Sequence, residues 1–136
     1  MDTIWEKYES NILCAELLLK SKQGFSEPSA HFVYYGVYHL IQYIICHKLN
    51  MSYSEQNEFS NGANSHKKLL DCFYTDLKKK LNQNSIDIWR TLERVKRKRN
   101  QSDYSSVLLS QQSLEENFND AITLIKNIKP LYGLTA

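Results

Sequence analysis

The sequence has few of the residues that build tight turns or covalent frameworks. Its 136 residues include four glycines, two prolines and three cysteines. So little glycine and proline argues against an all-β fold with many turns. The cysteines, Cys14, Cys46 and Cys72, are far apart, form no C-x-x-C pair and have apolar neighbours. We therefore expect three buried thiols in a reducing compartment, and neither a disulfide framework nor a zinc site.

The sequence also lacks a segment typical of secretion or membrane insertion. The first ten residues contain acids and no apolar core, so we expect no secretory signal. The longest apolar run, residues 30–49, contains polar side chains that are costly in lipid, namely His31, His39, Gln42 and His47. We interpret this run as a core helix and expect a cytoplasmic protein with no membrane partner.

Several signatures of catalytic sites are missing as well. The sequence contains no H-x-x-x-H pair, no His–carboxylate cluster and no glycine-rich phosphate loop. It also contains no serine nucleophile elbow and no dinucleotide fingerprint. We therefore expect no metal site and no cofactor.

Helical periodicity is present along nearly the whole chain. Apolar residues recur every three or four positions, which predicts an all-α fold: a single up-and-down helical bundle of about five helices. The predicted helices run from the N-terminus to near Gly24, from about 28 to 49, from about 65, from about 85 to the basic run, and from 113 to 130. The second is apolar nearly all round, which favours a central position. We expect residues 1–136 to form one domain, with 50–64 as its longest loop.

Helix-capping residues support these boundaries. Ser26 is expected to cap the second helix, with Pro28 in its first turn. Ser113 and Glu116 have the spacing of a capping box for the last helix, and Pro130 is expected to end it.

The formal charge is only +2, but it is unevenly distributed. Residues 90–99 hold six cations and one acid, so the remainder of the chain is acidic. One basic face on a near-neutral body is typical of proteins that bind phosphates. The candidates for such contacts are Arg90, Arg94, Lys96, Arg97 and Lys98. A solvated helix face explains these cations equally well.

Arg99 differs from the other cations because it continues an apolar stripe. Ile88, Leu92 and Val95 mark the inward face of this helix, and the next inward position is 99. An inward arginine requires a partner or a cavity. Asp103 lies four residues further, so spacing alone favours an intrahelical Arg99–Asp103 ion pair.

The residues around Arg99 resemble the motif of the HEPN superfamily, compact helical domains of prokaryotic toxin–antitoxin, CRISPR and abortive-infection systems. The family hallmark is an arginine, often followed by asparagine, with a histidine four to six residues after the arginine. Arg99 and Asn100 match, but Asp103 and Tyr104 follow and no histidine does. A bacterial branch with Arg-x-x-x-Asp-Tyr is most similar, and "AHFVYYGVYHLI" and "SHKKLLDCF" resemble its second and third helices.

This resemblance implies metal-independent endoribonuclease chemistry in a defence system, carried out by a homodimer. The arginine would steady the charged transition state, asparagine would orient the site and histidine would move the proton. Asp103 is normally ionised and Tyr104 normally protonated, so neither replaces histidine near neutral pH. His39, in the second helix, is the candidate substitute, although a histidine satisfied within the core is the favoured interpretation. For His66 a helix-start residue is favoured over a catalyst, and His31 and His47 flank the second helix without metal-ligand spacing.

Three interpretations therefore remain open. The chain acts on RNA or a nucleotide as a HEPN-like ribonuclease. Alternatively, it is a catalytically inactive HEPN-like domain that binds RNA, a nucleotide or a partner such as a nucleotidyltransferase antitoxin. The third is a helical adaptor whose basic stripe contacts an acidic protein.

Overall fold

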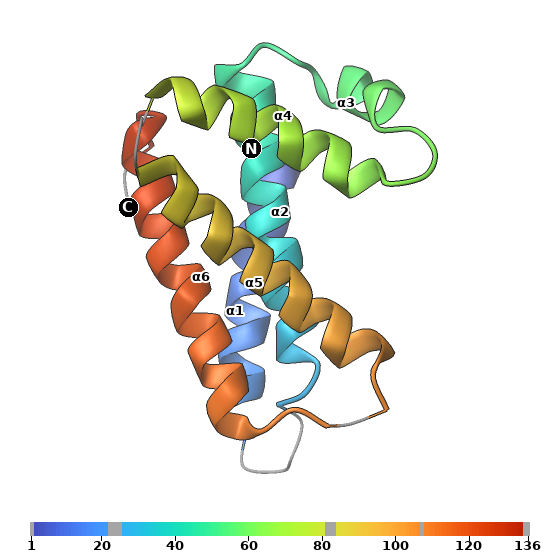
Figure 1. The fold of residues 1–136 in the computed structure, drawn as a ribbon, viewed down its shortest axis with the longest axis vertical. Helices are drawn as coiled ribbons and strands as arrows, with labels where there is room; N and C mark the ends of the chain where they lie inside the picture. Colours follow the sequence, from blue (N-terminus) through green and yellow to red (C-terminus); the bar gives the residue numbers. More distant parts are fainter. Residues whose placement is uncertain (1, 22–25, 81–83, 107, 135–136) are drawn as a thin grey trace.

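The computed structural model describes residues 2–21, 26–80, 84–106 and 108–134. Within these ranges the fold is all-α, as predicted, and Figure 1 shows its six helices. They are α1 (Thr3–Lys20), α2 (Ser29–Lys48), α3 (Tyr53–Phe59), α4 (Ser65–Lys80), α5 (Asn84–Tyr104) and α6 (Gln111–Leu131). No helix in the described ranges is long and apolar enough to span a membrane. The predicted stop near Gly24 lies outside the described residues.

Helix α2 is the centre of the fold, which confirms the interpretation of its apolar sequence. It contacts each of the other five helices; α5 crosses it diagonally (Figure 1), and α6 contacts both α2 and α5. Its fully buried large side chains are Val33, Tyr34, Val37, Leu40, Ile41, Ile44 and Ile45. A helix buried on nearly all sides fixes the position of every residue that it presents to its neighbours.

Helices α1 and α2 approach each other closely at Gly36. A Cβ atom added there would lie 2.6 Å from Cδ1 and 2.9 Å from Cγ1 of Ile12. Any larger residue at this crossing would force the Ile12 side chain to move. This close approach explains why a glycine stands at position 36, between Tyr35 and Tyr38.

Residues 50–64 were expected to be a loop, and that prediction is wrong for their central part. Helix α3 forms there because Ser52 and Glu55 make a reciprocal capping box. The buried Gln56 fixes the helix to the core, since its Nε2 donates to the carbonyls of Gln42 and Met51. Polar contacts hold this helix, so the search for an apolar period missed it.

The predicted caps also need correction. Ser26 does not cap α2; its hydroxyl donates to the Leu18 carbonyl, and Pro28 occupies the N-cap position. Helix α6 begins at Gln111 because Ser110 is the N-cap and accepts from the Ser113 amide. The helix also continues through Pro130 to Leu131, since amides beyond the proline bond to carbonyls of the last turn.

The prediction of three buried thiols is wrong. Cys14 is exposed, and Cys46 and Cys72 are only partly buried. The apolar neighbours of Cys14 misled the prediction because Leu13 and Leu17, on the same outer side of α1, are themselves 56% and 59% exposed.

Candidate functional site

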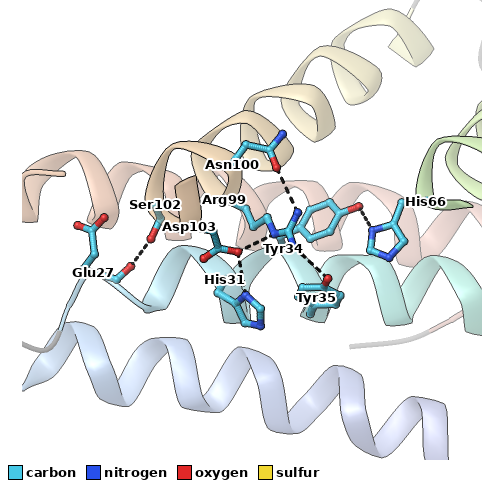
Figure 2. Close-up of polar contacts among 9 residues, drawn as sticks. All are labelled: Glu27, His31, Tyr34, Tyr35, His66, Arg99, Asn100, Ser102 and Asp103. Carbon is cyan, nitrogen blue, oxygen red and sulfur yellow. Dashed lines mark hydrogen bonds and ion pairs between the residues drawn. The ribbon is translucent and has the colours of Figure 1, made fainter. Parts of the chain in front are cut away.

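Arg99 lies where the C-terminal half of α5 meets α2 (Figure 2). Ile88, Leu92 and Val95 are buried, and Arg99 follows them on the same face, with its side chain 16% exposed. The inward orientation predicted from the stripe is therefore confirmed. The guanidinium sits at the open end of the core, near the surface.

The guanidinium of Arg99 has a polar contact for each nitrogen. Its Nε lies 2.9 Å from Asp103 Oδ2, which confirms the predicted i,i+4 ion pair. This contact is an ion pair and not an aligned hydrogen bond, because the buried Nε has no hydrogen-bond partner. Nη1 donates to Asn100 Oδ1 at 3.1 Å, and Nη2 donates to the Tyr35 hydroxyl at 3.2 Å.

Tyrosine rings surround the same cation. The guanidinium carbon lies 5.6 Å from the Tyr34 ring centre, 5.4 Å from that of Tyr35 and 5.5 Å from that of Tyr104. Cation–π attraction strengthens where water is displaced. Tyr34 is buried, whereas Tyr104 is 75% exposed. Tyr34 therefore contacts the guanidinium on its core side, and Tyr104 covers it on the solvent side.

Asp103 connects Arg99 to a histidine of α2. The carboxylate oxygen that pairs with Arg99, Oδ2, also lies 3.2 Å from His31 Nδ1 (Figure 2). The His31 ring packs against Phe32 and, at 4.7 Å between ring centres, against Tyr35. The side chain remains 43% exposed. Arg99, Asp103 and His31 thus form one continuous polar chain that reaches solvent.

A second histidine, His66 of α4, approaches the cluster from the opposite side. Its Nδ1 lies 2.9 Å from the Tyr34 hydroxyl, and its ring stacks on Tyr38 with 4.2 Å between centres. Burial, together with the charges of Arg99 and Lys96, lowers the pKa of His66. Burial raises the pKa of Tyr34 above its ordinary value and that of Tyr38 to about 12. His66 is therefore neutral near pH 7, and we assign the Tyr34 hydroxyl as the donor to Nδ1.

His39, the candidate substitute from the sequence, is bonded elsewhere. Its Nδ1 lies 2.8 Å from Gln42 Oε1 on its own helix, and burial lowers its pKa. Its ring centre is 6.2 Å from that of Tyr35, without a hydrogen bond to the Arg99 cluster among the described contacts. The histidines that the structure does bring to the Arg99 cluster are His31 and His66, which sequence reasoning did not select. No local spacing signals either histidine, because the His31–Asp103 and His66–Tyr34 contacts both join different helices.

The cations of the basic run point in different directions. Arg94 pairs with Asp120 at 3.5 Å and Lys98 donates to Ser113 at 2.8 Å, so both connect α5 to α6. Lys96 and Arg97 border a hollow of about 320 Å³ between α4 and α5, which Asn100 and Trp89 also line. Arg90 is exposed. Only part of the predicted basic face therefore lies beside Arg99.

Within the described ranges, no group of three or more histidine, cysteine, aspartate or glutamate side chains is placed to hold a metal ion. The chain matches no family model, no curated protein and no solved structure. Any functional assignment therefore depends on the geometry of the Arg99 cluster and on the resemblance seen in the sequence.

Proposed function

We propose that the chain is a HEPN-like domain, an up-and-down bundle that binds RNA at Arg99 and cleaves it without a metal ion. The supporting observation is the contact network of Arg99. The Arg99 guanidinium lies at the end of the core and donates to Asn100. It shares the Asp103 carboxylate with a histidine. Phosphodiester cleavage needs such a cation together with a group that can transfer a proton.

The hydrogen bonds of Arg99 suit it to a phosphate ligand. Nη1 and Nη2 donate to the neutral oxygens of Asn100 and Tyr35. A phosphate brings a full negative charge to the guanidinium as well as hydrogen-bond acceptors, so it can replace these neutral partners. The planar guanidinium fork can then hold two phosphate oxygens at once.

The surroundings of Arg99 also favour a nucleic acid strand. Three cations, including Lys96 and Arg97, and two acids line the neighbouring hollow, so its lining carries a net positive charge that attracts a phosphate backbone. Tyr104, 75% exposed over the guanidinium, offers a face on which an unpaired base can stack. A single-stranded segment can therefore cross α5 with its phosphate at Arg99.

A second candidate is a HEPN-like domain that binds without cleaving. The observation that favours it is the position of Asp103, whose carboxylate already neutralises Arg99 at 2.9 Å and would repel an incoming phosphate. In that case the Arg99 cluster stabilises the packing of α5 against α2 or forms a binding surface. The homodimer and the nucleotidyltransferase-type partner implied by the resemblance remain predictions under both candidates.

RNA binding can be tested with Arg99→Lys, because lysine keeps the charge and loses the planar fork. The probe is a fluorescent single-stranded RNA methylated at every 2′-oxygen, which cannot be cleaved by its own hydroxyl. We expect Arg99→Lys to weaken binding about tenfold, or about 1.4 kcal/mol. Arg94→Lys is the matched control, since Arg94 lies on the same helix but is 51% exposed. Equal affinities for the wild type and both variants would place the RNA away from Arg99.

A further inference from the structure

We infer that the hollow between α4 and α5 is a base-binding subsite, which takes an unpaired guanine from the RNA strand held at Arg99. This inference rests on the proposed RNA binding and names the base that the strand carries beside the bound phosphate. The hollow has a volume of about 320 Å³ and reaches the Arg99 cluster at Asn100. Its volume lies within the range of sites that hold small organic molecules.

The floor of the hollow is apolar. Leu70 of α4 is 3% exposed, Leu92 of α5 is 1% exposed, and Trp89 packs against the same core. The Trp89 indole stacks on Tyr74, with 4.5 Å between ring centres and 24° between planes. Tyr74 is not among the described residues that line the hollow, so the indole meets the hollow with a surface that Tyr74 leaves uncovered. A fixed indole beside an apolar floor is a platform on which a base can stack.

Charged groups of both signs surround this floor. Lys67 and Asp71 of α4 pair with each other at 2.8 Å, so these two charges are already compensated. Glu93, Lys96 and Arg97 of α5 also line the hollow. None of these three side chains forms a hydrogen bond or an ion pair with another described residue. The hollow therefore offers one carboxylate and two cations to a ligand.

Guanine matches this set of groups better than the other bases. Its Watson–Crick edge presents two adjacent donors, N1–H and N2–H, which the Glu93 carboxylate can accept together. Its O6 and N7 atoms are acceptors for an arginine or a lysine, and Lys96 and Arg97 lie on the same hollow. Adenine and cytosine offer a carboxylate a single amino group, and uracil offers only N3–H. Guanine alone uses both charges of the hollow.

Glu93 distinguishes a base subsite from a second phosphate subsite. A carboxylate repels a phosphate, so a surface that bound only the RNA backbone would be stronger without it. The same carboxylate accepts hydrogen bonds from the N–H groups of a base, which a phosphate diester lacks. The carboxylate thus gives the hollow selectivity at the expense of general attraction for RNA.

Asn100 connects the hollow to the guanidinium. Its Oδ1 accepts from Arg99 Nη1 at 3.1 Å (Figure 2), and its side chain also lines the hollow. From Asn100 back to Trp89 the hollow follows α5 for about 16 Å, at about 1.5 Å per residue. This length takes a ribose and its base, so a strand with a phosphate at Arg99 can place the adjacent base in the hollow. Tyr104 lies beyond Arg99 in the opposite direction along α5 and is free to stack on the base on the other side of the phosphate.

The test compares two short uridine RNAs methylated at every 2′-oxygen, one with a single central guanine and the other with a single central adenine. We expect the full chain to bind the guanine RNA about tenfold more tightly, since a bidentate contact to a base gives discrimination of this order. Glu93→Gln should bring the two affinities to within about twofold, because glutamine has one acceptor oxygen in place of two. It should also strengthen binding of the adenine RNA, since a repulsive charge is removed.

Asp87→Asn is the matched control for Glu93→Gln. Asp87 is an exposed carboxylate of the same helix and does not line the hollow. Its replacement removes the same charge, so both RNAs should bind more tightly while the preference for guanine stays as in the wild type.

A second readout places the base at Trp89. The chain has two tryptophans, so Trp5→Phe leaves Trp89 as the only one. Saturation with the guanine RNA should quench the fluorescence of Trp89, because a stacked base contacts the indole. Circular dichroism and thermal melting of each variant verify that it is folded.

The possible results separate this inference from the proposed function. Equal affinities for the two RNAs, with both weakened by Arg99→Lys, would overturn the guanine subsite and leave RNA binding at Arg99 standing. A guanine preference that persists in Glu93→Gln, or binding without quenching of Trp89, would place the base elsewhere and also overturn it. If neither RNA binds, the probe is 5′-GMP. Quenching by 5′-GMP that Glu93→Gln removes would leave the subsite standing without RNA, and no quenching would remove both proposals.

Discussion

At the scale of single residues, the candidate site depends on charges held at the boundary of the core. Arg99 has only 16% of its side chain exposed, and Asp103 supplies the opposite charge that such burial requires. The i,i+4 spacing predicted this pair, since both residues lie on one helix. His31 could not be predicted in the same way, because its contact with Asp103 depends on how α2 and α5 cross.

His66 makes the stability of the protein depend on pH. Burial lowers the pKa of His66, with smaller contributions from the charges of Arg99 and Lys96. As pH falls below about 6.5, the unfolded chain protonates this histidine before the folded chain does. The contribution of neutral His66 to the free energy of unfolding is therefore complete above pH 6.5. It is lost as the pH falls towards the lower pKa that His66 has in the folded state.

We predict a smaller pH effect in His66→Gln. Urea unfolding should give a lower free energy of unfolding at pH 5.5 than at pH 7.5 in the wild type. His66→Gln should lose less over this interval, because glutamine does not titrate and can still accept from Tyr34. Part of the loss should persist, since burial also lowers the pKa of His39. An identical pH dependence in the two proteins would contradict the account of His66.

At the scale of helices, the central position of α2 follows from its sequence, whereas α3 and the exact caps do not. An apolar surface all round predicts a helix surrounded by others. Helix α3 depends on the Ser52–Glu55 capping box and on two long-range bonds of Gln56. A search for periodic apolar residues does not detect a seven-residue helix held in this way.

The crossing of α1 and α2 gives a prediction at this scale. Gly36→Ala improves helix propensity by about 1 kcal/mol, but the new Cβ would lie 2.6 Å from Cδ1 of Ile12. Overpacking costs about 1–3 kcal/mol, so we expect a net loss of about 1 kcal/mol in the free energy of unfolding. Chemical denaturation of the purified protein measures this difference.

A double variant isolates the steric cause. Ile12→Ala removes the two atoms that would lie within 3.0 Å of the new Cβ, so Gly36→Ala should stabilise the protein in that background. If Gly36→Ala costs the same free energy with and without the Ile12 side chain, the close contact is not the reason for glycine at this position.

At the scale of the whole molecule, the site exists because three helices meet. Helix α5 supplies Arg99 and Asp103, α2 supplies His31 and the tyrosines, and α4 supplies His66 (Figure 2). The sequence predicted the all-α class, the inward arginine and its carboxylate. Which histidine completes the cluster depends on tertiary packing, and no local spacing encodes it.

RNA cleavage in EDTA, followed by analysis of the product ends, tests the central claim most directly. We predict that the wild type produces 2′,3′-cyclic phosphate ends. Arg99→Ala should lower the rate about 100-fold or more, because it removes the group that stabilises charge in the transition state. The control is Arg90→Ala, which removes an exposed cation of the same helix. Equal rates for Arg99→Ala and the wild type, or no cleavage of varied single-stranded RNAs by the wild type, would contradict this assignment.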